Sequence, residues 1–316
     1  MPPTLNIAFV HPGKAFLPEL EAYKRFFGGL GIQCQVLHPS ALAKQHIDIE
    51  WHIMGTHFKR VHPEAILIHE YASLSTPPFA SAKDLVKKWL NCRPDFRLFL
   101  NEEVSSVMDF NDGIPFGFRD MFVSSAPAAP GPLPPKYDFI YIGSVSRERK
   151  AQKLLDVFGS GAMRNNSILI LSQNFSDLQQ LYREFPNISF SGPVEPAAVG
   201  QFIQQARYAI NYQPPYRPFN LQTSSKFLEY AAQRKPIITS DNTWTRNFQR
   251  KYGGRFFYLK DDLSNFTPGA IQAFEFSQPE LTGWTFLDQV IRSGVLDYLR
   301  KKTGLDIFDI RNQVVQ

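Results

Sequence analysis

The stretch DFIYIGSVSRERKAQKLLDVF, residues 138–158, decides the fold of this chain. Residues 139–142 form an apolar run typical of a buried strand, and the strand is expected to end at Gly143 and Ser144. A helix is expected to begin in the run Arg147–Lys150. Four apolar residues recur there at helical spacing: Ala151, Leu154, Leu155 and Phe158. A buried strand, a short loop and an amphipathic helix form one βα unit of a parallel sheet.

The alternation of strand and helix continues on both sides of this unit. Apolar runs predict further strands at 5–10, 32–37, 65–71, 96–101, 167–172, 188–192, 208–212 and 236–241. Helical spacing falls at 18–29, 81–91, 177–184, 196–206 and 224–235. The pattern predicts an α/β fold with mostly parallel sheets.

The segment SSAPAAPGPLPPK, residues 124–136, interrupts this alternation. Its proline density excludes regular structure and indicates a stiff linker between two α/β domains. We therefore expect an N-terminal domain at 1–130, a second domain at 131–290, and helices at 291–316. Two such halves are expected to hold a ligand in a cleft between them, at the carboxyl ends of their strands.

Composition limits the classes of function. The 316 residues suffice for two hydrophobic cores, and the net charge of +5 suits a phosphate-bearing ligand or an anionic membrane surface. The charge is too small and scattered to indicate nucleic acid. A long apolar run, a signal peptide and a cysteine pair at metal-ligand spacing are not seen in the sequence. We expect a cytoplasmic protein, with peripheral contact at the inner face of the membrane as an open alternative.

The cations at Arg147, Arg149 and Lys150 point to a phosphate. Positive charges in a first helical turn oppose the helix dipole, so we expect a ligand that reverses the sign of this interaction. A diphosphate would accept hydrogen bonds from free N–H groups and would pair with the cations. The alternative is a solvated basic face on a surface helix.

A second segment with unusual charges is NLQTSSKFLEYAAQRK, residues 220–235. Ser224 or Ser225 is a natural N-cap, and Lys226 places a cation in the first turn. Glu229 misses the spacing of a capping box but lies where a carboxylate facing a cleft could accept both hydroxyls of a ribose. The alternative is a surface ion pair of Glu229 with Lys226 or Arg234, which contributes little stability.

Residues 136–290 resemble the nucleotide-binding domain of two-domain, GT-B fold glycosyltransferases. The matching segments are YIGSVSRERK, ISFSGPVEPAAVGQFIQQARYAIN, SSKFLEYAAQRKPIITSD and the late tryptophan in GWTFLDQVI. The resemblance implies two Rossmann-like domains facing a cleft, with terminal helices that return to the first domain. It also implies donor contacts in two groups: Gly143, Ser144, Arg147 and Lys150 at the diphosphate, and Ser224, Ser225, Lys226 and Glu229 at the second phosphate and ribose.

The sequence departs from many retaining members of that family. They carry a second acid eight residues before the ribose-binding one, where this chain has Leu221. Recognition of the sugar hydroxyls and the stereochemical course of transfer therefore stay open.

Residues for catalysis and for the acceptor are sought in the first half. His69 and the pair Glu102 and Glu103 end predicted strands, where a general base near neutral pH is expected. His69 is alternatively a core histidine, and the two acids alternatively begin a helix. Gly13 and Lys14, after the first strand, are candidates for the acceptor side.

Neither a metal nor a resident cofactor is expected. His38, His46, His57 and His62 have no ligand-like spacing, and Asp261–Asp262 falls in a predicted surface turn. The predicted function is transfer of a sugar from a UDP- or GDP-linked donor to a glycan, a lipid-linked sugar or a small molecule, as in polysaccharide biosynthesis. The alternatives are nucleotide-sugar epimerisation or phosphorolysis on the same fold, and a non-catalytic subunit that binds a nucleotide sugar.

Overall fold

The computed structural model describes residues 5–13, 17–53, 55–123 and 134–309. These residues divide into two compact units, Met1–Met121 with Thr285–Gln316 and Phe122–Trp284, called here the N-terminal unit and the C-terminal unit. Each unit has its own six-stranded sheet in which every pairing is parallel. The expected α/β class is confirmed. The hinge expected at 124–136 lies mostly outside the described residues, so a boundary at residue 130 stays a prediction.

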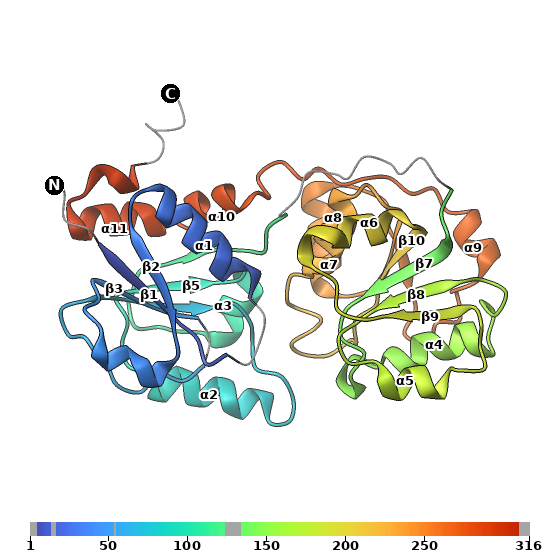
Figure 1. Cartoon of the computed structure of the whole chain (residues 1–316), viewed down its shortest axis with the longest axis horizontal. Coiled ribbons are helices and arrows are strands. Elements are labelled where there is room, and N and C mark those ends of the chain that lie inside the picture. Colours follow the sequence, from blue (N-terminus) through green and yellow to red (C-terminus); the bar gives the residue numbers. More distant parts are fainter. Residues whose placement is uncertain (1–4, 14–16, 54, 124–133, 310–316) are drawn as a thin grey trace. The chain divides into compact units, whose positions relative to one another are not determined.

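The sheet of the N-terminal unit has the order β2-β1-β3-β4-β5-β6. Its strands are β1 (Asn6–Val10), β2 (Gln33–Leu37), β3 (Ile49–Ile53), β4 (Ile66–Tyr71), β5 (Phe96–Phe99) and β6 (Phe116–Phe118). Its helices are α1 (Pro18–Gly29), α2 (Ala80–Leu90), α3 (Glu102–Met108), α10 (Phe286–Arg292) and α11 (Val295–Thr303), with short 3-10 helices at Pro39–Lys44 and Asp306–Phe308. The helices α1, α10 and α11 lie on one face of the sheet and α2 lies on the other (Figure 1).

Aromatic residues fill the core between this sheet and α1, α10 and α11. Phe9, Tyr23, Phe27 and Trp51 are fully buried there with ring centroids 4.7–6.2 Å apart. Aromatic contacts of this kind add to the free energy of burial. The residues of α10 and α11 that join the same core include Val290, Val295, Leu296 and Leu299.

The same core encloses a buried ion pair between Arg119 and Glu70. The Glu70 carboxylate also accepts hydrogen bonds from Trp51 Nε1 at 2.7 Å and from the Tyr23 hydroxyl at 3.2 Å. Glu19 lies 3.5 Å from the Arg119 guanidinium. The interactions of Glu70 compensate for the burial of its charge and tie α1, β3, β4 and the segment after β6 together, whereas the two carboxylate oxygens of Glu19 have no hydrogen-bond partner among the described residues.

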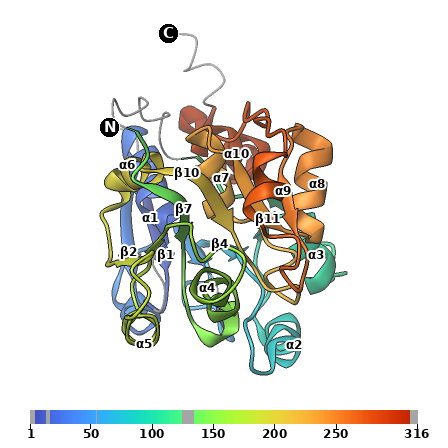
Figure 2. The same ribbon diagram turned by 90° about the vertical axis from the view of Figure 1, so that its right-hand side faces the viewer.

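The sheet of the C-terminal unit has the order β12-β11-β10-β7-β8-β9. Its strands are β7 (Tyr137–Ile142), β8 (Ile168–Leu171), β9 (Ile188–Ser191), β10 (Ala206–Asn211), β11 (Ile237–Ser240) and β12 (Phe257–Leu259). Its helices are α4 (Ala151–Gly159), α5 (Ser176–Leu181), α6 (Val199–Gln204), α7 (Ser225–Ala232), α8 (Thr243–Tyr252) and α9 (Pro268–Gln272), with 3-10 helices η2 (Arg147–Arg149) and η3 (Pro196–Ala198). The helices α4 and α5 lie on one face of this sheet and α6 and α7 on the other, as two perpendicular views show (Figures 1 and 2).

The strand order places a switch point in each sheet. In the C-terminal unit, the chain winds outward in one direction from β7 through β8 to β9 and then crosses back to β10 on the other side of β7. This is the order of a Rossmann fold, in which ligands bind beyond the carboxyl ends of the strands where the winding reverses. In the N-terminal unit, the corresponding point lies between β1 and β3.

Candidate functional site

The candidate site lies at the carboxyl edge of the second sheet, at its switch point. Gly143 directly follows β7, one of the two strands there, and the segment 212–224 connects β10, the other strand, to α7. The two segments singled out in the sequence therefore reach the edge at which a parallel sheet of this order binds ligands.

The turn after β7 needs its glycine. Gly143 has φ +150°, a conformation that side chains disfavour. The Tyr141 hydroxyl donates a hydrogen bond to the Ser144 carbonyl at 2.8 Å and holds the turn closed. The strand ends where the sequence predicts, and the backbone turns sharply enough to present the residues that follow.

The helix after this turn begins later than predicted. Arg147–Arg149 form a 3-10 turn, Lys150 has φ +52°, and α4 starts at Ala151. The cations precede α4 rather than filling its first turn, because the left-handed conformation of Lys150 breaks the helical hydrogen-bond pattern. The predicted helix start within Arg147–Lys150 is wrong, but Lys150 is the N-cap of α4 and still places a cation at the positive end of its dipole. The apolar face of α4 is confirmed, since its four predicted residues are all buried.

The basic turn packs against the loop after β10. The Arg149 guanidinium lies 4.1 Å from the centre of the Phe219 ring, and the Tyr216 hydroxyl donates to the Glu148 carbonyl. Burial lowers the pKa of Arg149. Arg147 and Lys150 are exposed, with the Lys150 ammonium 5.2 Å from the Tyr216 ring. The loop after β10 thus packs against Arg149, whereas Arg147 and Lys150 face solvent.

Ser224 begins α7 and is its N-cap. Its hydroxyl accepts a hydrogen bond from the Phe227 N–H at 3.3 Å and donates one to Asn211 Oδ1 at 2.6 Å. Asn211 in turn donates to Thr239 on β11 at 3.0 Å. The Ser224 side chain therefore joins the helix start to two strands, and Ser225, which is half-buried, is the more accessible hydroxyl at this end of α7.

Lys226 and Glu229 form an ion pair one turn apart on α7. The lysine nitrogen lies 2.8 Å and 2.9 Å from the two carboxylate oxygens, and each side chain keeps about a third of its surface exposed. This is the pairing that the sequence offered as the alternative interpretation of Glu229. The helix α7 reaches the end of β7, since the hydroxyl of Tyr230, the residue after Glu229, accepts a hydrogen bond from the Ile142 N–H at 2.8 Å.

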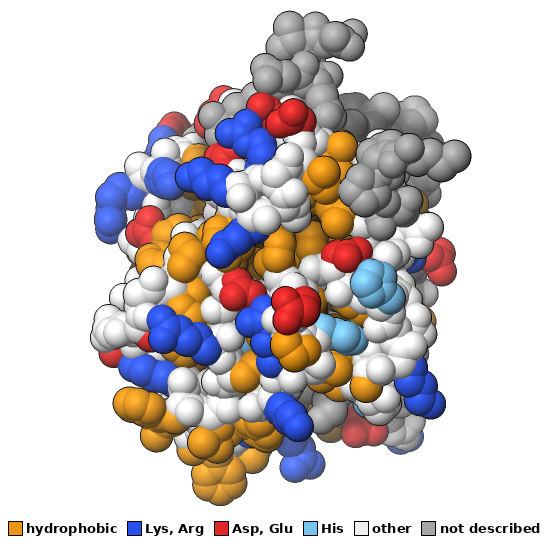
Figure 3. Space-filling model, turned by 90° about the vertical axis from the view of Figure 1, so that its left-hand side faces the viewer, with side chains coloured by type: hydrophobic (Ala, Val, Ile, Leu, Met, Phe, Trp, Pro, Cys, Tyr) orange, Lys and Arg blue, Asp and Glu red, His pale blue; other side chains and the backbone are white. Residues whose placement is uncertain are grey.

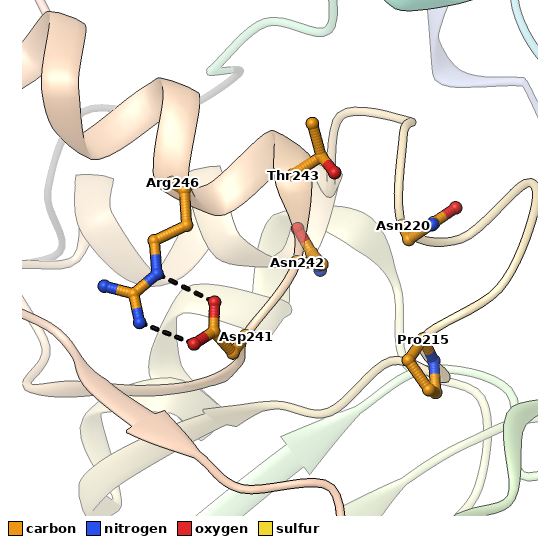
Figure 4. A pocket seen from close by; sticks show the side chains of 6 residues that line it. All are labelled: Pro215, Asn220, Asp241, Asn242, Thr243 and Arg246. Carbon is orange, nitrogen blue, oxygen red and sulfur yellow. Dashed lines mark hydrogen bonds and ion pairs between the residues drawn. The ribbon is translucent and has the colours of Figure 1, made fainter.

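A pocket of about 340 Å³ opens beside these segments and contains residues that sequence reasoning missed. Arg246 forms two parallel hydrogen bonds with Asp241, at 2.7 Å and 2.5 Å, and Figure 4 shows this pair on one side of the pocket. The arginine lowers the pKa of the Asp241 carboxyl. The residues that line the pocket are Pro215, Asn220, Asp241, Asn242, Thr243 and Arg246. Sequence reasoning could have found these residues because they belong to the segments that follow β10 and β11, at the edge where such sheets bind ligands.

The predicted catalytic residues lie in the N-terminal unit. His69 is a buried residue in the middle of β4, with Nε2 3.0 Å from Nδ1 of His57, and burial holds its pKa well below the usual range. Glu102 and Glu103 are the first two residues of α3, after the N-cap Asn101, where the helix dipole favours acids. The structure does not bring these acids and His69 into one described cluster of titratable groups.

The predicted acceptor residues follow β1 at the switch point of the first sheet. Gly13 has φ +73° and donates its N–H to Nδ1 of His11 at 3.1 Å, whereas Lys14 lies outside the described residues. Sequence reasoning did not single out His11 as a base. It is largely buried at this edge, and desolvation lowers its pKa, so its ring is neutral at pH 7.

Comparisons with known proteins give matches in structure alone. The sequence matches neither a family model nor a curated protein. The structure is similar to sucrose-phosphate synthase from Thermosynechococcus elongatus (TM-score 0.63, 12% identity, covering 85% of this chain and 89% of that one). It is also similar to HepE from Anabaena, solved with UDP and glucose (0.61, 10%, 98% of each chain), and to AviGT4, a glycosyltransferase of avilamycin A biosynthesis (0.55, 11%, 97% of each chain).

Proposed function

We propose that this protein, which has the GT-B fold with two Rossmann-like α/β units, transfers a sugar from a nucleoside-diphosphate sugar to an acceptor. The observation that carries the proposal is the meeting of the β7 turn and α7 at the switch point of the second sheet. These segments are far apart in the chain, and the sequence predicts that both bind the same ligand. The UDP and glucose bound to HepE, a protein with the same fold, add support.

The donor diphosphate pairs with Arg147 and Lys150 in this proposal. Both are exposed at the β7 turn, and the N-terminus of α7 adds N–H groups and the positive end of its dipole. Together with Lys226 they supply the positive charge that the departing diphosphate requires. We therefore propose a transfer that does not depend on a metal ion at the donor.

The ribose of the donor hydrogen-bonds to Glu229. In the structure this carboxylate is paired with Lys226. Donor binding exchanges that partner: the ammonium turns to the diphosphate and the carboxylate accepts the ribose hydroxyls. The exchange costs little, because a half-exposed ion pair of this kind contributes only about 0.2–1 kcal/mol.

The candidates for the base that activates the acceptor hydroxyl all belong to the N-terminal unit. Glu102 and Glu103 stay our candidates among the acids, and the neutral ring of His11, at the switch point beside Gly13, joins them as the histidine candidate. His69 is the least accessible of the proposed bases, since only 3% of its surface is exposed. Separate Gln and Asn variants at these positions identify the base by a loss of kcat that exceeds the change in KM.

The exposed face of α2 supports peripheral contact with an anionic membrane, and with it a lipid-linked acceptor. Trp89 and Leu90 are 71% and 58% exposed, and the nearby Phe79 is 80% exposed. Lys83 and Lys88 lie on the same helix, and Figure 3 shows hydrophobic and basic side chains gathered on the side of the unit where α2 lies. Aromatic residues beside lysines suit the interface of an anionic bilayer. Among the described residues, none of the helices is long and apolar enough to span a bilayer.

Vesicle co-sedimentation tests this contact. Wild-type protein should bind vesicles that contain anionic lipid and should leave them at high salt. The variant Trp89→Ser should bind less, whereas Leu181→Ser, an exposed apolar residue on α5, should bind as wild type does. Equal binding by both variants would remove α2 from the proposal.

Donor binding and turnover test the enzymatic function itself. Calorimetry with UDP, GDP, TDP, CMP and ADP should identify one preferred nucleotide, and its sugar conjugate should be hydrolysed slowly when no acceptor is present. Conversion of the sugar without release of the nucleotide would favour an epimerase. Tight binding without hydrolysis or transfer to any acceptor would favour a non-catalytic subunit. Failure to bind any nucleotide would reject the proposal.

A further inference from the structure

A cluster of histidines, one cysteine and one glutamate fills the face of the first sheet opposite the aromatic core. Glu50 and His52 point to this face from β3, and His69, the register partner of His52, does so from β4. His57 comes from the loop after β3, and Cys92 follows α2. These five residues, called here the histidine cluster, form two overlapping groups of ligand-type atoms.

Three lone-pair donors converge within the histidine cluster. Nδ1 of His57 lies 3.0 Å from Nε2 of His69 and 3.3 Å from Sγ of Cys92, and all three atoms lie within 4.8 Å of one another. Ligands at the usual zinc–nitrogen and zinc–sulfur distances of a tetrahedral site stand roughly 3.3–3.6 Å apart. The two spacings from Nδ1 of His57 are therefore close to those of a zinc ligand set.

Hydrogen bonds among these three atoms cannot satisfy all of them at once. One Nδ1 atom faces both a ring nitrogen and a sulfur, and a single proton on it can be donated well to only one of them. A cation at the centre would accept all three lone pairs together.

Glu50 completes the arrangement from the opposite side of His57. Its Oε1 atom lies 3.3 Å from Nε2 of His57, the ring nitrogen that points away from the three donors. The carboxylate is fully buried and is also held by Nε2 of His52 at 2.6 Å and Nδ1 of His62 at 2.9 Å. Nε2 of His57 is buried and makes no hydrogen bond to the described residues, so the carboxylate acts on this ring through its charge alone. If Nε2–H turned to donate to Glu50 when Nδ1 binds a metal, this hydrogen bond would orient the ring and raise its basicity.

We propose that Nδ1 of His57, Nε2 of His69 and Sγ of Cys92 bind one Zn²⁺ ion, with Glu50 orienting His57 from outside the coordination sphere. Mixed nitrogen and sulfur donors select zinc over magnesium or calcium. The Cys92 thiol releases its proton to solvent when the Zn–S bond forms. Three protein ligands leave one position of the tetrahedron for water or another exchangeable ligand.

The ion would link the loop after β3, which carries His57, to Cys92 at the end of α2. The His57 N–H already donates to Asn91 Oδ1 at 2.8 Å, and the Cys92 N–H donates to the His57 carbonyl at 2.7 Å. Zinc adds a link from this pair to β4 through His69. All of these residues belong to the N-terminal unit, whereas the proposed donor residues belong to the C-terminal unit, so the two proposals can fail separately.

Metal titration of the full chain tests the site. Protein stripped with a chelator under reducing conditions should bind one equivalent of Zn²⁺ and show a higher Tm. Co²⁺ as a substitute should give the visible bands of a tetrahedral ion and a thiolate charge-transfer band. In Cys92→Ser this band should vanish, whereas Cys34→Ser, at the other free cysteine, and His46→Ala, at an exposed histidine, should keep it.

A variant of Glu50 separates orientation from ligation. Glu50→Gln should keep the thiolate band and bind Zn²⁺ about 10–100-fold more weakly. Circular dichroism and unchanged nucleotide affinity serve as controls for folding in every variant. Wild-type protein that is folded and reduced but binds no stoichiometric Zn²⁺, or a Cys92→Ser variant that keeps the band, would overturn the proposal and leave the cluster a hydrogen-bonded core.

Discussion

The substitution Glu229→Gln tests the proposed donor site at its most specific residue. It keeps the shape of the side chain and removes its charge. In the wild type the carboxylate must first leave Lys226, 2.8 Å away, at a cost of about 0.2–1 kcal/mol. It then accepts two ribose hydroxyls in charge-assisted bonds, each worth about 1 kcal/mol more than the neutral bonds that an amide makes. The net loss of donor affinity on substitution is about 1–2 kcal/mol, which corresponds to a 5–30-fold increase in Kd.

Calorimetry with a nucleoside diphosphate and its 2′-deoxy analogue measures this loss. The variant should weaken the ribonucleotide more than the deoxyribonucleotide, because the deoxy analogue already lacks one of the two hydroxyls. Stability should change by less than about 1 kcal/mol, since the broken ion pair is half-exposed. Glu21→Gln is the matched control, because Glu21 forms the same type of pair with Lys24, at 3.1 Å, in the other unit. If Glu229→Gln leaves the ratio of the two affinities at the wild-type value, the carboxylate does not contact the ribose.

Three further predictions concern charge. The double variant Arg147→Ala, Lys150→Ala should raise the Kd for the nucleoside diphosphate at least tenfold in calorimetry and make binding less sensitive to salt, and an unchanged Kd would contradict the phosphate assignment. Glu70→Gln removes the carboxylate closest to the buried Arg119, so the free energy of unfolding measured in urea should fall by about 3 kcal/mol. A decrease below about 1 kcal/mol would refute the role of this pair. The hydrogen bonds from Arg97 lower the pKa of Asp112 to about 2, so the stability that they add is present above pH 4 and is lost as the pH falls through 2. In acid unfolding, the stability of Asp112→Asn should therefore fall less than that of the wild type as the pH drops through 2. An equal fall in both proteins would contradict this role of the hydrogen bonds from Arg97.

The sequence predicted the class of fold well because local signals agree in most elements. Strands such as β7 and β8 are short apolar runs, and α1 occupies the predicted range from Pro18 to Gly29. The strand β3 was missed although its residues IEWHI alternate polar and apolar types, as a strand with one exposed face does. All five residues are buried, so the alternation does not mark an exposed face here. Its polar residues are satisfied only by partners that are distant in the chain, such as His62 for Glu50. Such partners leave no local trace in the sequence.

The start of α4 is a second difference, and its cause is a contact with residues distant in the chain. The run Arg147–Lys150 favours a helix by composition, but packing of Arg149 on Phe219 and of Lys150 near Tyr216 accompanies a 3-10 turn instead. These aromatic partners come from the loop after β10. Arg147–Lys150 still lie at the switch point, as predicted. Their conformation depends on the loop after β10, and the sequence does not show that this loop contacts them.

The sequence by itself determined the alternation of strands and helices, the turn at Gly143 and the capped start of α7, since each depends on residues within one turn or one strand. Only the tertiary structure decided the order of the strands, the packing of Arg149 on Phe219 and the histidine cluster. Strand order depends on the sum of side-chain packing across whole sheets, and the histidine cluster depends on contacts between residues as distant as Glu50 and Cys92. The physical reason is that a short-range pattern fixes backbone conformation, whereas the free energy that brings remote side chains together arises from burial of the complete fold.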